Sequence, residues 1–168
     1  DIPDYDAQII TNSKHMADLF EAATAICKKP KKVSNWLMGE TLRLLKENNM
    51  DPEDLSFAPE NLAKLVDLAD AGTVNSSVAK EVFEQIFKEN VDPEVYIEEH
   101  GLKTVNDEGA LKATIEQIVS ENPQSVADYK GGKKKAIGFL VGQTMKAMKG
   151  KADPASVNKI LKEILDQE

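Results

Sequence analysis

The chain has 168 residues, the size of one ordinary domain or two small ones. With 41% hydrophobic and 30% charged residues and a net charge of −8, its composition is that of a globular protein and excludes a disordered one. A single cysteine, Cys27, excludes an intramolecular disulfide and a multi-cysteine zinc site, and we expect a cytoplasmic protein. The chain starts at Asp1 without a signal peptide or an apolar run of membrane-spanning length, and we expect it to be part of a longer protein.

Apolar residues recur at helical spacing along nearly the whole chain, whereas the alternation typical of strands is scarce. We therefore predict an all-α fold of two small helical domains. The first two helices are expected to be long, over residues 5–27 and 32–48, and to pair as an antiparallel hairpin after the break at Pro30. Trp36 is assigned to the interface of this hairpin. The lysines of segment 28–32 are interpreted as a solvated turn, with a phosphate contact as the alternative.

Prolines and glycines mark the ends of the shorter helices, which we expect near residues 59–71, 75–90 and 93–100. An acceptor side chain followed by proline, the pattern of an N-cap and first helical position, occurs at Asp51-Pro52, Asp92-Pro93 and Asp153-Pro154. Weaker starts of the same kind are Ala58-Pro59 and Asn122-Pro123. Helices are expected to stop at Gly72, Gly101, Gly131-Gly132 and Gly150.

A connector over residues 100–106, ending in Asn106 as an N-cap, predicts a domain boundary, with domains at 1–104 and 105–168. Charge is distributed in agreement with this division. Residues 1–105 carry 11 basic and 20 acidic side chains, a net charge of −9, whereas residues 106–168 carry 10 and 9, a net charge of +1. The two domains are therefore expected to face different partners.

Residues 129–151 contain seven lysines and no acidic residue. Wound as a helix, residues 133–149 present a core face and an opposite face. The expected core face consists of Ile137, Leu140, Val141, Thr144, Met145 and Met148. The opposite face, within an arc of about 80°, is a lysine–glycine stripe made of Lys135, Gly138, Gly142, Lys146 and Lys149.

The glycines of this stripe require an explanation, because each costs about 1 kcal/mol relative to alanine within a helix. A phosphate backbone that approaches the helix closely would use the bare surface, and the lysines would supply counter-charge. The alternative is that Gly138 and Gly142 form a contact with a neighbouring helix while the lysines extend around it. Phe139 is expected to pack against the next helix, with stacking on a base as the alternative.

No catalytic, metal or cofactor site is predicted within the chain. His15 and His100 have no ligand partners at metal-binding spacing, and no phosphate-binding loop or nucleophile motif is present. Cys27 has no nearby histidine that would make it a nucleophile.

Several segments resemble the C-terminal tail of the B subunits of the aspartyl/glutamyl-tRNA amidotransferases. The final third also resembles the free-standing YqeY proteins. Residues 41–54 match no pattern of the family. The segments that carry the resemblance are Pro3-Asp4-Tyr5-Asp6-Ala7, Ser34-Asn35-Trp36-Leu37-Met38-Gly39-Glu40, Lys133-x-Lys135-Ala136-x-Gly138-x-Leu140-Val141-Gly142-Gln143-x-Met145-Lys146 and Lys149-Gly150-Lys151-Ala152-Asp153-Pro154.

The resemblance implies a helical domain followed by a YqeY-like domain, which together hold tRNA for an enzyme that amidates misacylated Glu-tRNA(Gln) or Asp-tRNA(Asn). ATP and Mg²⁺ are implied for a catalytic domain outside this chain. The implied partners are tRNA and the other enzyme subunits, with neither DNA nor a membrane among them. The alternative function is a protein-interaction module that docks enzyme subunits without touching RNA. The residues expected to bind RNA are Lys133, Lys134, Lys135, Gly138, Gly142, Gln143, Lys146, Lys149 and Lys151.

Overall fold

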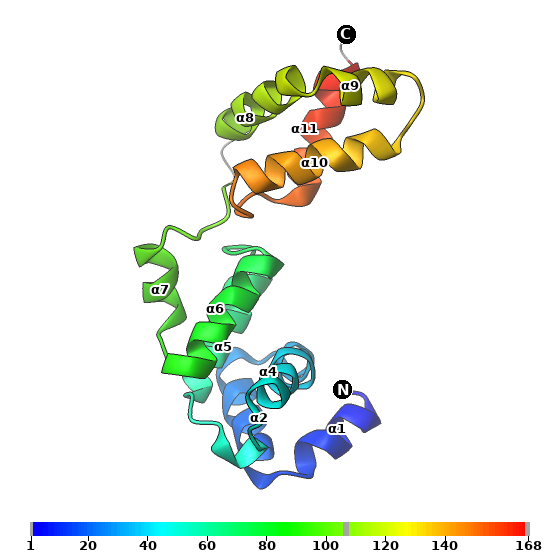
Figure 1. Ribbon diagram of the computed structural model, residues 1–168. Coiled ribbons are helices and arrows are strands. Elements are labelled where there is room, and N and C mark those ends of the chain that lie inside the picture. Colours follow the sequence, from blue (N-terminus) through cyan, green and yellow to red (C-terminus); the bar gives the residue numbers. More distant parts are fainter. Residues whose placement is uncertain (1, 106–107, 167–168) are drawn as a thin grey trace. The chain divides into compact units, whose positions relative to one another are not determined.

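The computed structural model describes residues 2–105 and 108–166, and these are mostly α-helical (Figure 1). No strand occurs in these two ranges, apart from one isolated bridge between Val105 and Ala152. The predicted all-α class is therefore confirmed. The contacts between residues divide the chain into two compact units, and the boundary between the units lies between Leu102 and Lys103. The predicted N-cap Asn106 lies outside the described residues.

The N-terminal unit contains seven α-helices, a π-helix and a 3₁₀-helix within its described part. In chain order they are α1 (Asp4–Thr11), α2 (Lys14–Cys27), α3 (Pro30–Trp36), the π-helix (Leu37–Thr41), α4 (Leu42–Asn48), the 3₁₀-helix (Pro52–Asp54), α5 (Pro59–Asp70), α6 (Ser76–Glu89) and α7 (Pro93–Glu99).

The long first helix predicted over 5–27 is wrong, because the chain breaks between Thr11 and Lys14. Ser13 caps α2 by accepting a hydrogen bond from the Met16 backbone N–H at 3.2 Å. The second predicted helix begins at Pro30 and continues to Asn48, but it passes through one π-helical turn.

Packing in the N-terminal unit also differs from the expected hairpin, since α2 packs more extensively against α5 than against α3. The Trp36 ring lies 5.2 Å, centroid to centroid, from the ring of Phe83 in α6. Phe83 is fully buried and also meets Phe57 edge-on at 5.7 Å. Trp36 therefore contacts a helix that the sequence prediction did not assign to it.

Short helices in this unit agree with their predicted ranges. The observed first and last residues of α5, α6 and α7 each lie within one residue of the predicted ones. Proline occupies the first turn of α5 and α7, where its missing N–H costs no hydrogen bond. The predicted start at Asp51-Pro52 yields only the 3₁₀-helix.

The C-terminal unit contains α8 (Glu108–Glu121), α9 (Pro123–Lys130), α10 (Lys135–Ala147) and α11 (Pro154–Asp166). Helix α10 contacts each of the other three. The hydrophobic core of the C-terminal unit is separate from that of the N-terminal unit. It is formed by Leu111, Ile115, Ile118, Leu140, Ala152, Val157, Leu161 and Leu165. No helix in the described residues has the length and apolar character needed to cross a membrane.

Candidate nucleic-acid interface

Helix α10 has the two faces that its sequence predicts. Leu140 and Thr144 are fully buried, and the Thr144 hydroxyl donates a hydrogen bond to the Leu140 carbonyl at 2.9 Å. The other four residues of the predicted core face are partly buried against the same core: Ile137, Val141, Met145 and Met148. The predicted core face is therefore confirmed.

On the opposite face, both glycines of the lysine–glycine stripe are exposed. A methyl group placed on Gly138 or Gly142 would meet no described heavy atom within 4 Å. Thus no helix of the C-terminal unit's described part packs on the glycine pair. The alternative that Gly138 and Gly142 contact a neighbouring helix therefore finds no such helix in the described part of the C-terminal unit. Close packing there does not offset the loss of helix stability that the two glycines cause.

Helix α10 is shorter than the predicted range of 133–149, so three lysines expected within the helix flank it instead: Lys133, Lys134 and Lys149. Lys134 occupies the N-cap position, and Lys149 lies beyond the last helical residue, Ala147. Lys149 adopts a left-handed conformation with φ of 52°. The Gly150 N–H donates to the Met145 carbonyl at 2.8 Å, as in the Schellman motif that closes many helices. The prediction that Lys149 belongs to the helix is therefore wrong.

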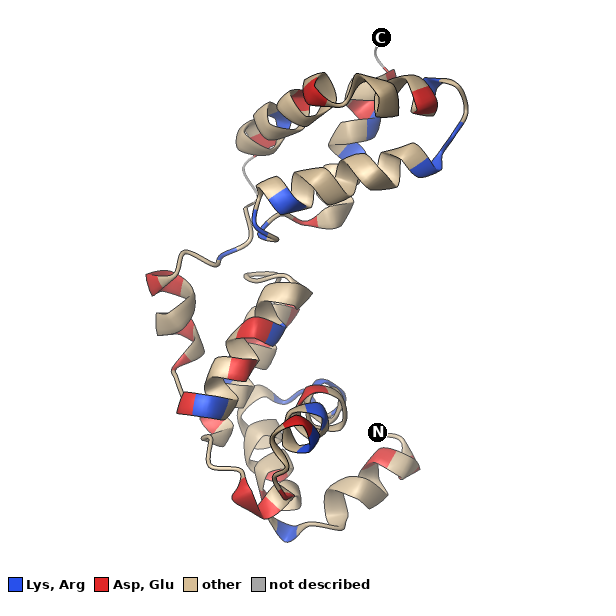
Figure 2. Ribbon diagram, viewed as in Figure 1, with Lys and Arg blue, Asp and Glu red and all other residues tan. Residues whose placement is uncertain are grey.

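One of the predicted lysines is already paired. Lys133 Nζ lies 3.0 Å from Asp128 Oδ1, and this hydrogen bond lowers the pKa of the Asp128 carboxyl below its usual value. Basic residues, blue in Figure 2, lie at both ends of α10 and in the loop before it. Within the described part of the chain, no ion-pair partner is found for Lys134, Lys135, Lys146, Lys149 and Lys151.

Phe139 lies beside the stripe with 49% of its surface exposed. It does not belong to the core cluster of the C-terminal unit, and its packing against the next helix stays a prediction. Gln143 and Lys151, the remaining members of the predicted set, are half-buried.

Two residues of α11 that the sequence analysis does not single out line a pocket together with Lys134 and Ile137. Asn158 and Lys162 lie four positions apart on α11, which places them on the same face of that helix. Their spacing in the sequence indicates that they share a face of one helix. Only the fold shows that α11 brings this face close to the start of α10.

The basic segment 28–32 is partly used within the N-terminal unit. Lys29 Nζ lies 2.6 Å from Asp67 and 3.1 Å from Asp70, and Lys32 Nζ also pairs with Asp70 at 3.1 Å. These ion pairs join the start of α3 to α5, so the cluster is more than a solvated turn.

The two histidines are both engaged by backbone carbonyls. His15 Nε2 lies 2.7 Å from the Leu55 carbonyl oxygen, and His100 Nδ1 lies 2.9 Å from that of Tyr96. In the ranges that the structure describes, no three His, Cys, Asp or Glu side chains are grouped to hold a metal ion.

The sequence of this chain is similar to those of a known protein family. The model of the GatB domain family matches residues 18–165. The B subunit of the aspartyl/glutamyl-tRNA(Asn/Gln) amidotransferase of Agathobacter rectalis is 70% identical over 165 residues, which is 98% of this chain and 35% of that protein. The corresponding subunits of Lachnoclostridium phytofermentans and of a Thermoanaerobacter species are 62% and 50% identical, each over 99% of this chain and 35% of the relative. The chain thus spans about a third of the length of these curated relatives.

Proposed function

Because the chain belongs to the GatB domain family, we propose that it is the tRNA-holding C-terminal part of an amidotransferase B subunit. The parent enzyme would convert Glu-tRNA(Gln) or Asp-tRNA(Asn) to Gln-tRNA(Gln) or Asn-tRNA(Asn), with ATP and ammonia derived from glutamine. It would work in the cytoplasm together with the other amidotransferase subunits. The catalytic residues and the ATP and Mg²⁺ sites would lie in the part of the parent protein outside this chain. In this proposal, residues 1–104 form a helical tail domain and residues 105–168 the YqeY-like domain that contacts RNA.

The observation that carries the proposal is the open surface over Gly138 and Gly142. On the face of α10 between Lys135 and Lys146, Gly138 and Gly142 are exposed, and a methyl group placed on either would meet no described heavy atom within 4 Å. A sugar-phosphate backbone fits such a surface, because phosphates then come within reach of lysines while the ribose lies against the glycines. Unpaired lysines favour this arrangement, since no internal ion pair has to be broken first.

A second candidate is the docking of another protein, and Phe139 is the observation that favours it. A half-exposed phenylalanine beside a Gly-x-x-x-Gly pair offers apolar area and close approach to a helix of another protein. Such a contact would bury the lysine stems without using their charge.

Binding of tRNA to the 168-residue chain, measured at several salt concentrations, tests the proposal. If three or four lysines contact phosphates, the logarithm of the binding constant should fall against that of salt with a slope of about −2 to −4. Lys146→Ala should weaken binding and lessen the slope by somewhat under one unit. Lys112→Ala removes an exposed lysine from α8 and serves as the matched control. Absence of binding, or binding that does not respond to salt, would favour protein docking.

A further inference from the structure

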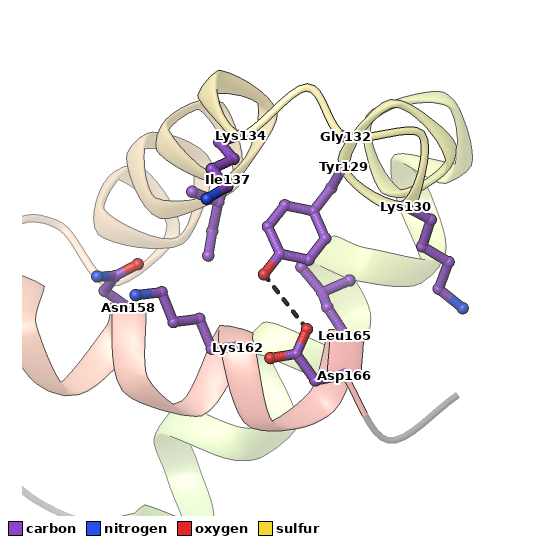
Figure 3. A pocket seen from close by; sticks show the side chains of 9 residues that line it. All are labelled: Tyr129, Lys130, Gly132, Lys134, Ile137, Asn158, Lys162, Leu165 and Asp166. Atoms are coloured by element: carbon purple, nitrogen blue, oxygen red, sulfur yellow. Dashed lines mark hydrogen bonds between the residues drawn. The ribbon is translucent and has the colours of Figure 1, made fainter.

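The C-terminal unit has a pocket that the lysine–glycine stripe does not use. It lies where the loop between α9 and α10 faces α11, and its volume is about 730 Å³ (Figure 3). This volume is within the usual range for small-molecule sites. The side chains that give it its character are Tyr129, Lys134, Ile137, Asn158, Lys162 and Leu165.

One wall of the pocket is apolar and contains an aromatic ring. Leu165 is buried, Ile137 packs on the core, and the half-buried ring of Tyr129 stands beside them. The Tyr129 hydroxyl donates a hydrogen bond to Asp166 Oδ1 at 3.3 Å, which holds the ring in place. Burial and the nearby Asp166 raise the pKa of the Tyr129 phenol, so the ring stays neutral. This wall suits a flat ring.

The other wall is polar and cationic. In Figure 3, the side chains of Lys134, Asn158 and Lys162 lie on the same side of the Tyr129 ring, while that of Lys130 points away. Neither ammonium group of Lys134 and Lys162 has an ion-pair partner among the residues that the structure describes, and the Asn158 amide has no hydrogen-bond partner there. Two unpaired lysines can bind a phosphate, and an amide beside them can both donate and accept a hydrogen bond.

We propose that this pocket binds a nucleotide. The phosphate lies between Lys134 and Lys162, the base lies on the wall formed by Tyr129 and Ile137, and Asn158 bonds the sugar or the base edge. The nucleotide comes either from bound RNA, as one unstacked residue, or from a free mononucleotide. The RNA source rests on the proposed function, whereas the free mononucleotide does not.

Adenosine 5′-monophosphate is the first probe, added to the isotope-labelled 168-residue chain and followed by nuclear magnetic resonance. We expect saturable shifts at the Asn158 side-chain amide and around Tyr129. Adenosine alone and inorganic phosphate alone should each bind at least about tenfold more weakly, because each fills only one wall. Phosphate that binds as tightly as the nucleotide would overturn the assignment of a base to the apolar wall.

Lys162→Ala should weaken the mononucleotide about tenfold. Lys159→Ala removes the same charge from the same helix outside the pocket lining, and should leave the affinity unchanged. Unchanged far-UV circular dichroism in both variants shows that the unit remains folded. Equal effects of the two variants would mean that only net charge matters, and would overturn the proposal.

Addition of tRNA distinguishes the two sources. If bound RNA supplies the nucleotide, tRNA displaces the mononucleotide, and Lys162→Ala weakens tRNA binding severalfold while Lys159→Ala does not. If a free nucleotide is the ligand, tRNA and mononucleotide bind together and Lys162→Ala leaves tRNA affinity unchanged. Binding of the mononucleotide without binding of tRNA would overturn the proposed function, while the proposal that the pocket binds a nucleotide would still hold. A chain that binds tRNA, with no mononucleotide shifts and no effect of Lys162→Ala, would overturn the pocket alone.

Discussion

Lys133 and Asp128 form an ion pair, with 3.0 Å between Nζ and Oδ1, just before the start of α10. Asp128 comes from α9, so this pair joins the end of one helix to the loop that leads into the next. It also pairs the charge of Lys133, the first of three consecutive lysines. Lys134 and Lys135, which follow, have no such partner in the described ranges.

Asp128→Asn should strengthen tRNA binding. The substitution removes the carboxylate charge from Lys133, whose ammonium group then becomes available to a phosphate. We expect a severalfold rise in affinity at low salt, and a salt slope steeper by somewhat under one unit. Glu116→Gln, which removes an exposed acidic charge from α8, is the control measured in the same titration. Equal gains from both variants would show that net charge alone is responsible.

Gly142→Ala should raise the stability of the C-terminal unit and weaken tRNA binding. The added methyl group meets no described atom within 4 Å, and alanine stabilises a helix by about 1 kcal/mol relative to glycine. The same methyl group would hold an RNA backbone away from the helix. Thermal unfolding and tRNA affinity measure the two effects.

Gly39→Ala provides the matched control, because Gly39 is also exposed and open but lies in the π-helix of the N-terminal unit. It should leave tRNA affinity unchanged. A destabilised Gly142→Ala variant with unaltered affinity would instead indicate that a helix packs on this surface.

The two hydrophobic cores should unfold separately. Trp36 is the single tryptophan and belongs to the N-terminal unit, so its fluorescence reports on that unit alone. Leu161→Ala removes a fully buried side chain from the C-terminal core and should lower its stability by about 2–5 kcal/mol. Urea unfolding should then shift in circular dichroism and not in Trp36 fluorescence.

Phe83→Ala is the reciprocal variant. It removes the ring that packs against Trp36, and should lower the midpoint of the fluorescence transition through a loss of about 3–5 kcal/mol. If either variant moves both transitions together, the two units unfold as one body and the predicted division at residue 104 is refuted.

Acid should destabilise the N-terminal unit, in part through Asp92. A hydrogen bond from Lys64 and two backbone N–H groups of α7 hold the pKa of Asp92 below its usual value, against the opposing effect of burial. The unfolded chain therefore takes up this proton at a higher pH than the folded one. The stabilisation is complete above the ordinary aspartate pKa of about 3.9 and is lost as the pH falls through the lower folded value.

Urea midpoints from Trp36 fluorescence, measured between about pH 5 and pH 3, check this sign. Asp92→Asn keeps an oxygen that can cap α7 but removes the charge, so its midpoint should fall less steeply with acid. Some fall should remain, since the pKa of Asp70 is also lowered by Lys29 and Lys32. An equally steep fall in the variant would show that the pair with Lys64 has no net effect.

Local sequence determined the class of the fold and most of its helix ends. Pro59, Pro93 and Pro154 start helices because a first-turn proline loses no hydrogen bond, and this holds whatever the helix packs against. Periodicity likewise determined which side of α10 is buried, since Leu140 and Thr144 repeat at helical spacing. Both are short-range properties of the chain.

Only the tertiary structure decided which elements meet. Trp36 packs on Phe83, 47 positions later, and Lys162 reaches the same pocket as Lys134, because contacts between distant segments depend on the shapes of whole helices. The same reason applies to Gly138 and Gly142. A helical period shows that their side of the helix faces away from its own core, but whether another element covers that side is decided by where the neighbouring helices run.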